Sequence, residues 1–315
     1  MPRHNINKIN PSSSTIEEYK KLQPHPDRIS GGLRLKEKFH KRPEPGKPLV
    51  SIITIVLNNN KTLKQTIESV LEQTYENIEY IVIDGGSTDG TLDILRKYDD
   101  KISYWQSEPD KGVSDAFNKG VAASKGDIIG LINSDDWLSV DQIEQGVNAL
   151  NKTSADFVFG DIIFHNSSGI PKFRIHGNPY YADKISSKMP DLCHPTVLVR
   201  RNAYERVGLF DINYHYAMDY EWLLRLHKHG GIGLYFKEII AHMRLLGLSD
   251  RFYTKAYQEV RDIAVYYGQP RWLAHYLYIF RVIKGFTRHA LEKTAPAFLY
   301  HWMRKVVNQR YSSQA

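Results

Sequence analysis

The feature that most constrains the fold of this chain is a short apolar segment that ends abruptly in oxygen-bearing side chains. Residues 128–132 form an almost unbroken apolar run of strand length, and Asn133-Ser134-Asp135-Asp136 follows directly. A buried strand of this kind delivers its polar residues to the carboxyl edge of an open α/β sheet, where such sheets bind ligands. Carboxylate and amide oxygens are hard ligands that suit Mg or Mn. The alternative is a polar turn in which Asp135 or Asp136 caps the helix that follows.

Two strand-like segments precede this one, and their order predicts a parallel sheet. Residues 49–57 and 78–83 are apolar runs rich in β-branched residues, and residues 62–73 between them repeat apolar residues at helical spacing. This β-α-β order favours parallel strands joined by a crossover helix. Similar patterns predict a helix at 113–123 and strands at 102–105, 155–160 and 162–164. The predicted fold class is α/β, with a mixed sheet flanked by helices and a helical carboxy-terminal extension.

The second apolar run ends in a glycine-rich turn that starts at Asp84 and leads into a helical pattern at Thr91. Small residues let the backbone approach a ligand closely, and Asp84 at the strand tip can accept hydrogen bonds from a base or a ribose. The alternative is an ordinary turn in which Ser87 or Asp89 caps the helix. Lys111, before the helix predicted at 113–123, would either meet a phosphate or lie in solvent.

Charge is unevenly distributed along the 315 residues, which carry a net charge of +7. Residues 1–48 contribute +6, residues 49–270 contribute −6 and residues 271–315 contribute +7. Because binding to a phosphate backbone needs clustered cations, the acidic middle argues against nucleic acid as its substrate. One cysteine excludes a disulfide scaffold and a cysteine zinc cluster. With no signal peptide or spanning segment indicated, we expect a cytoplasmic protein, free or bound at the inner face of the cell membrane.

Composition also suggests three regions. Residues 1–48 are rich in Pro, Ser, Lys and Asn and are expected to form an extension or linker, with the folded domain at 49–250. Residues 251–315 show a helical pattern of aromatic residues interleaved with Arg and Lys. Such a pattern is typical of a helix at a membrane surface, and equally of a helix packed on the enzyme or on a second subunit.

Taken together and in order, four segments resemble the nucleotide-sugar-binding half of the family 2 glycosyltransferases, which have the Rossmann-like GT-A fold. These segments are residues 51–58, 83–91, 112–120 and 126–136, within a match that covers about 48–246. The resemblance implies inverting transfer of a sugar from a nucleoside diphosphate sugar, with a divalent cation, Mn or Mg, as cofactor. Four positions depart from the family pattern: Asn133 replaces an acid, Gly85 replaces a second acid after Asp84, Phe117 stands where an arginine is frequent, and Met218 replaces the acid before Asp219.

The resemblance also assigns roles to individual residues. Asp84 corresponds to the aspartate that contacts the base, and Asp135 to the acid that coordinates the metal. Asp219, in the segment 216–226, corresponds to the general base, which inverting transfer needs in order to take the proton of the acceptor; the alternative is that Asp219 caps the helix after it. We assign nucleotide-sugar binding to Asn58, Asp84, Lys111, Asp115, Asn133, Ser134, Asp136, His194 and Arg244, metal binding to Asp135 and His242, and catalysis to Asp219.

The sequence therefore predicts an inverting, hexosyltransferase-like glycosyltransferase with a hydroxyl acceptor. UDP is the expected nucleotide by family habit, and the acceptor is expected to be a carbohydrate or lipid-linked molecule in cell-surface polysaccharide or glycolipid synthesis. One alternative is a nucleotidyltransferase, although residues 58–61 lack the glycine-rich loop that such an enzyme would carry after its first strand. The other is a degenerate scaffold that binds sugar or membrane without chemistry. It would have lost Asp135 or Asp219, and both are present.

Overall fold

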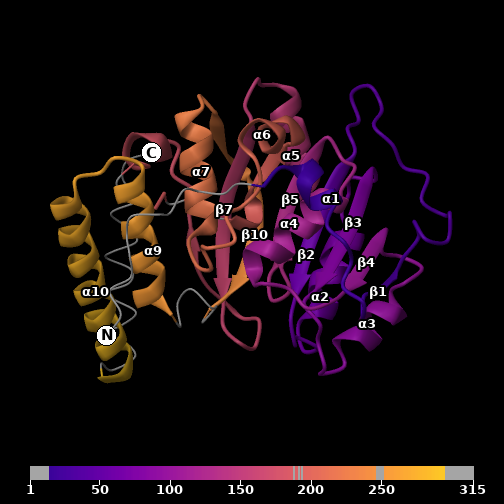
Figure 1. Ribbon diagram of the computed structural model, residues 1–315, viewed down its shortest axis with the longest axis horizontal. Coiled ribbons are helices and arrows are strands. Elements are labelled where there is room, and N and C mark those ends of the chain that lie inside the picture. The colour runs from indigo at the N-terminus through magenta and orange to yellow at the C-terminus, as the bar shows by residue number, and fades with distance from the viewer. Residues whose placement is uncertain (1–13, 187–188, 191, 193, 246–251, 295–315) are drawn as a thin grey trace. The chain divides into compact units, whose positions relative to one another are not determined.

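The structure is a computed structural model that describes residues 14–186, 189–190, 192, 194–245 and 252–294 (Figure 1). The chain divides into two compact units. The first comprises Met1–Tyr181 and Asp191–Leu245, and the second comprises Ala182–Pro190 and Leu246–Ala315. The candidate site lies in the first unit.

A mixed sheet forms the centre of the first unit. Its ten strands, counted over the described residues, are β1 (Ile29–Gly31), β2 (Val50–Val56), β3 (Ile78–Asp84), β4 (Tyr104–Ser107), β5 (Ile128–Asn133), β6 (Trp137–Leu138), β7 (Phe157–His165), β8 (Pro171–Ile175), β9 (Leu198–Arg200) and β10 (Gly233–Arg244). The strand order is β1-β4-β3-β2-β5-β9-β7-β10-β6, and β8 pairs with β7. The predicted mixed α/β sheet is therefore confirmed.

The direction of the strands brings their polar ends to one edge. Strands β2, β3, β4 and β5 are parallel neighbours, β9 runs antiparallel between β5 and β7, and β10 is parallel to β7. The carboxyl ends of β2, β3, β4, β5, β7 and β10 therefore all lie at the same edge of the sheet. In an open α/β sheet this is the edge that binds ligands.

Helices cover both faces of the sheet, because alternate strand residues point in opposite directions. Apolar residues of α2 (Leu63–Leu71), α3 (Thr91–Lys97) and α5 (Gln142–Asn151) share one core with residues such as Ile52 and Val82. Helix α4 (Val113–Ala123) packs on the other face, where a Cβ on Gly120 would overlap Ile53. The remaining helical elements of this unit are α1 (Ile16–Lys20), η1 (Tyr181–Lys184, which crosses into the second unit), η2 (His194–Thr196), α6 (Arg201–Val207) and α7 (Met218–Lys228).

The described part of the segment 1–48, expected to be an extension or linker, contributes to the first unit. Strand β1 pairs antiparallel with β4 and extends the sheet. Helix α1 begins with a capping box formed by Thr15 and Glu18, and its Tyr19 is buried against α4. The Tyr19 hydroxyl donates to Asp115 over 2.8 Å and accepts a hydrogen bond from Asn118 over 3.2 Å.

One strand prediction needs correction. The sequence predicted two strands on either side of Asp161, whereas β7 continues through this residue. Asp161 is fully buried, and its carboxylate accepts hydrogen bonds from Arg174, His176, the Gly177 backbone N–H and the Tyr235 hydroxyl at 2.7 to 3.0 Å. Because these partners satisfy the carboxylate, an acid is tolerated in the middle of a buried strand.

The second unit contains α9 (Tyr253–Tyr266) and α10 (Arg271–Thr294), which pack against each other. The guanidinium of Arg261 on α9 lies 5.0 Å from the ring centre of Tyr278 on α10. Six large apolar side chains of α10 remain exposed, namely Trp272, Tyr276, Ile279, Phe280, Ile283 and Phe286. Among the described helices, none combines the length and the apolar character needed to cross a membrane.

Candidate active site

The loop after β5 brings two carboxylates together at the carboxyl edge of the sheet. Asp135 is partly exposed and Asp136 is buried, with the Asn133 amide donating to Asp136 over 3.4 Å. Burial raises the pKa of both acids, and the charge of Asp135 raises that of Asp136 further, to well above its usual value. Two neighbouring acids that resist ionisation are stabilised as carboxylates by a nearby cation.

The backbone of this loop is held by polar side chains near α2. The Thr66 hydroxyl lies 2.9 Å from the Ser134 carbonyl and 2.7 Å from the Asp136 carbonyl. The Asn59 amide donates to the Ser134 hydroxyl over 3.0 Å. Since the Ser134 hydroxyl and carbonyl both have protein partners, Ser134 fixes the loop, and the carboxylates beside it are preorganised.

Arg244, at the end of β10, contacts the acidic loop. Its guanidinium donates to the Asp135 carbonyl and to Gln65, and lies 4.8 Å from the ring centre of Trp137. Its positive charge partly offsets the increase in the pKa of Asp135 that burial causes. The site thus combines acids that suit a divalent cation with a fixed cation suited to a phosphate.

The metal role predicted for His242 is not supported by the structure. Its Nδ1 lies 2.9 Å from Nε2 of His165, and its Nε2 lies 3.0 Å from the Ser139 hydroxyl. The ring also stacks on Trp137 with a centroid distance of 5.1 Å. Burial, helped by His165, lowers the pKa of His242 to about 4. Because both nitrogens are engaged within the protein, His242 supports Trp137 rather than presenting a lone pair to a cation.

A cation at this loop would need ligands from outside the protein. Within the described residues, no group of three or more His, Cys, Asp or Glu side chains could hold a metal ion. Mg²⁺ commonly binds through one or two carboxylates and takes its other ligands from water and substrate phosphates. The hard oxygens of Asp135 and Asp136 fit that mode, so the donor set is compatible with a cation carried by a diphosphate.

Asp84 lies at the end of β3, where the sequence placed it, but its side chain is fully buried. Its carboxylate accepts from the backbone N–H groups of Gly86 and Ser87 at 3.2 and 2.9 Å, from the Ser87 hydroxyl, and from the Ser107 hydroxyl at 2.5 Å. These bonds tie the ends of β3 and β4 to the glycine-rich turn. The described structure therefore leaves Asp84 no exposed oxygen for a base.

Asn58 is also tied to this turn. It has a positive φ of 49°, its N–H donates to the Ser87 hydroxyl over 2.7 Å, and its side-chain oxygen accepts from the Thr88 N–H over 2.9 Å. An asparagine tolerates this left-handed conformation better than most residues. Asn58 thus shapes the loop after β2 and leaves its side chain exposed at the candidate edge.

The donor-binding role predicted for Asp115 is not supported, whereas Lys111 remains available. Asp115 is buried, and its carboxylate accepts from the Tyr19 hydroxyl over 2.8 Å and from the Lys111 N–H over 3.0 Å. Lys119 lies 3.5 Å from the same carboxylate. These contacts satisfy the buried acid at the start of α4 and join it to α1. The Lys111 side chain is exposed beside it.

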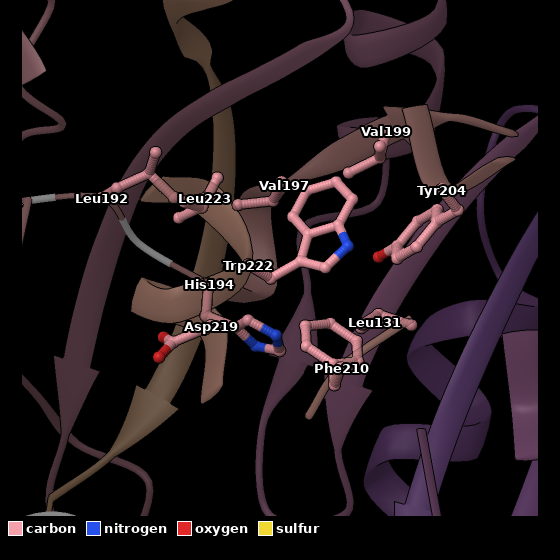
Figure 2. Close-up of a pocket in the computed structure, with 10 residues that line it drawn as sticks. All are labelled: Leu131, Leu192, His194, Val197, Val199, Tyr204, Phe210, Asp219, Trp222 and Leu223. Atoms are coloured by element: carbon pink, nitrogen blue, oxygen red, sulfur yellow. The ribbon is translucent and has the colours of Figure 1, made fainter. Parts of the chain in front are cut away.

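Asp219 and His194 line a small, mainly apolar cavity, as Figure 2 shows. The cavity also has Trp222, Tyr204 and Phe210 in its wall and holds about 20 Å³. This volume is close to that of a single water molecule and cannot contain a sugar. The cavity therefore provides an apolar environment for the two polar side chains, while Asp219 itself remains partly exposed.

This environment changes the acidity of both groups. Burial raises the pKa of Asp219, and the nearby His194 partly opposes that increase. Burial lowers the pKa of His194, and Asp219 partly opposes that decrease. Asp219 also lies in the first turn of α7, where its Oδ1 accepts from the Tyr220 N–H over 2.8 Å. A carboxylate with a raised pKa is a stronger base than an exposed one.

Helix α7, which carries Asp219, is anchored by contacts to which sequence reasoning had assigned no role. Arg225 donates to the carbonyls of Val207 and Leu209, the latter over 2.7 Å, and pairs with Glu221 over 2.8 Å. The Trp222 indole donates to the Gly208 carbonyl over 2.9 Å. Both anchors are buried, so they fix the helix against the turn at 207–209.

Comparisons with known proteins identify the family of this chain. The family model described as "Glycosyl transferase family 2" matches residues 51–208. An uncharacterized glycosyltransferase of Mycobacterium tuberculosis (strain H37Rv) is 34% identical over 182 residues, which cover 56% of this chain and 68% of that protein. An uncharacterized glycosyltransferase of Rickettsia typhi is also 34% identical over 182 residues, covering 55% of this chain and 57% of the relative, so the chain matches little more than half of that protein.

Solved structures share the fold at low sequence identity. The mannosyltransferase PcManGT from Pyrobaculum calidifontis, in complex with GDP-Man and Mn²⁺, has a TM-score of 0.55 and 16% identity over 95% of this chain and 88% of its own. Residues 1–349 of S. aureus TarS, in complex with UDP-GlcNAc, give a TM-score of 0.52 and 13% identity over 81% of this chain and 79% of that one. The mixed α/β fold is that of the GT-A glycosyltransferases. By its match to the family model and to its relatives, the chain belongs to glycosyl transferase family 2 and is a glycosyltransferase.

Proposed function

We propose that the chain transfers a sugar from a nucleoside diphosphate sugar to a hydroxyl acceptor with inversion at the anomeric carbon. The observation that carries this proposal is the meeting of Arg244 with the Asp135 loop at the carboxyl edge of the parallel strands. An acidic pair beside a fixed guanidinium suits a diphosphate accompanied by a divalent cation. In support, one structural neighbour was solved with GDP-Man and Mn²⁺ and another with UDP-GlcNAc. UDP is our first expectation for the nucleotide.

The proposed mechanism needs one base and one stabilised leaving group. Asp219 takes the proton of the acceptor hydroxyl as its oxygen forms the new bond to the anomeric carbon. The bond from that carbon to the diphosphate breaks, and the diphosphate leaves with the electron pair. In this mechanism Arg244 and the exposed Lys111 stabilise its negative charge. Asp135 would hold Mn²⁺ or Mg²⁺, which supplies further charge stabilisation when bound.

The donor half of the proposal can be tested without knowing the acceptor. We expect UDP with Mn²⁺ to raise the melting temperature, with GDP as the second candidate. A ligand present at 100 times its Kd stabilises a protein by about 2.7 kcal/mol, which is roughly 5–10 °C for a domain of this size. A thermal shift assay with each nucleotide, with and without EDTA, measures the effect.

The same assay identifies the metal-binding acid. Asp135→Ala should abolish the metal-dependent part of the shift. Asp93→Ala, which removes an exposed acid from α3, should retain it. A shift that is the same in EDTA, or that survives in Asp135→Ala, would contradict the assignment of Asp135 to the metal.

We further propose that the acceptor is lipid-linked or a surface carbohydrate and that α10 contacts an anionic membrane. Trp272, Phe280 and Phe286 on α10 are 73%, 56% and 68% exposed. Residues 271–290 contain four Arg or Lys and no acid. The positive charge of this helix complements anionic headgroups, whereas the same helices of two copies of the chain would repel each other.

Vesicle binding tests this contact. We expect the protein to sediment with vesicles containing anionic lipid, less so at high salt because the attraction is screened. Trp272→Ala/Phe280→Ala/Phe286→Ala should weaken binding at least about tenfold, because burial of each large apolar side chain contributes about 1.5–3 kcal/mol. Tyr180→Ala is the control, since Tyr180 is an equally exposed aromatic residue of the first unit. Binding that is unchanged in the triple variant would exclude α10 as the contact.

A further inference from the structure

The buried state of Asp84 raises the question of which acid faces the nucleoside. Asp84 accepts four hydrogen bonds from Gly86, Ser87 and Ser107 and has no exposed surface. Because the side chain is fully buried, a ligand could reach its oxygens only if the surrounding loops moved. Asp84 therefore holds the loops around it in place, and any carboxylate that faces a ligand at this edge belongs to another residue.

Asp110 supplies a carboxylate beside Gly85, the first residue after β3. It lies in the loop between β4 and α4 and is partly exposed. Its Oδ1 accepts from the Gly112 N–H over 2.8 Å, which fixes the side chain. Among the described residues, none donates a hydrogen bond to Oδ2, so this oxygen remains available. Burial, with smaller contributions from Asp115 and Asp84, raises the pKa of Asp110, so its carboxylate gains from a hydrogen-bond donor.

The position of this oxygen explains why the neighbouring residue is glycine. A Cβ built on Gly85 would lie 2.5 Å from Oδ2 of Asp110 and 3.4 Å from Cδ1 of Leu57. The first distance is too short for two non-bonded atoms, so a side chain at 85 and the observed Asp110 rotamer exclude each other. The acid that the sequence lacks at 85 is thus replaced in space by the carboxylate of Asp110.

We propose that Oδ2 of Asp110 accepts a hydrogen bond from the nucleoside of the donor, and that Asp84 is a positioning residue for the surrounding loops. The inference rests on the proposed function, because it assumes a nucleoside diphosphate sugar at this edge. The hydrogen-bond donor is either a ribose hydroxyl or a ring N–H of the base. Both groups present the same chemistry to a carboxylate, and analogues of the nucleotide distinguish them.

The test compares nucleotide affinities of the full chain by calorimetry. The first probes are UDP and GDP with Mn²⁺. Whichever binds is then compared with its 2′-deoxy, 3′-deoxy and ring-N-methyl analogues. Asp110→Asn keeps an oxygen for the Gly112 N–H and replaces the free oxygen by an NH₂ group, and Asp110→Ser is a second variant in case the first folds poorly. Asp93→Asn is the control for loss of an exposed acid.

We expect Asp110→Asn to weaken UDP or GDP binding by roughly 10- to 100-fold, because hydrogen bonds to charged groups are strong. For the one analogue that lacks the interacting group, the wild type and Asp110→Asn should bind with equal affinity. That analogue shows whether the group belongs to the ribose or to the base. The inference is wrong if the wild type binds and both Asp110 variants bind within twofold of it, or if they lose affinity equally for every analogue. Failure of the wild type to bind either nucleotide would instead overturn the proposed function, and the inference with it.

Discussion

Asp219→Asn is expected to lower kcat by about two to four orders of magnitude, the usual contribution of a general base. The amide keeps the shape of the side chain and an oxygen that can accept the 2.8 Å hydrogen bond from the Tyr220 N–H, but it cannot take a proton. Because Asp219 is not part of the acidic loop at Asp135, nucleotide binding should change little. Steady-state rates with saturating donor, together with nucleotide Kd values, separate these two effects.

The pH dependence gives an independent check on the same residue. A base must be ionised to act, so the wild-type rate should fall as the pH decreases through the pKa of Asp219. Because burial raises that pKa, the fall should occur above the usual value of 3.8. The residual activity of Asp219→Asn should not show this fall in rate as the pH decreases. Glu205→Gln, which changes an exposed acid on α6, should retain both the rate and the profile. A variant at Asp219 that retained more than about a tenth of the rate would contradict the assignment.

Sequence reasoning was most accurate where a periodic pattern coincided with a specific backbone requirement. The helix predicted at 113–123 begins and ends where α4 does. Its apolar residues recur at helical spacing, and Gly112 before it has a φ of 106°, which favours glycine. Likewise, the strand before Asp135 was identified because a buried parallel strand is apolar on both faces.

Sequence reasoning failed where a side chain's role depends on a residue far away in the chain. Asp115 is 96 residues from Tyr19, and His242 is 77 residues from His165. Neither partner can be identified from local periodicity, so both residues looked available for a ligand. Asp84 is a different case, because its partners are within 23 residues. There the position was predicted correctly, but the number of donors around the carboxylate was not.

Asp110 shows which part of the candidate site could be predicted from the sequence and which part could not. The resemblance to the family implies that an acid is missing at Gly85, and the loop at 107–112 contains two acids, Glu108 and Asp110. What the sequence cannot give is that the loop places one of these acids, Asp110, within 2.5 Å of where the missing side chain would begin. A compensating residue of this kind becomes visible only from the close approach of two loops.

Arg225→Met should destabilise the first unit by about 3–5 kcal/mol, because it removes the guanidinium that neutralises the fully buried Glu221. It also leaves the carbonyls of Val207 and Leu209 without their donor. For a domain of this size, the melting temperature should fall by roughly 6–20 °C. Thermal and urea unfolding measure the loss.

The cause can be separated from simple loss of packing by a second substitution. Glu221→Gln in the Arg225→Met background removes the buried negative charge, so it should recover part of the lost stability. Recovery should be incomplete, because the carbonyls of Val207 and Leu209 stay unsatisfied. If the double variant were less stable than Arg225→Met, the ion pair would not be the main contribution. Since α7 carries Asp219, the recovered stability should be accompanied by recovered activity, which would link the buried pair to the position of the base.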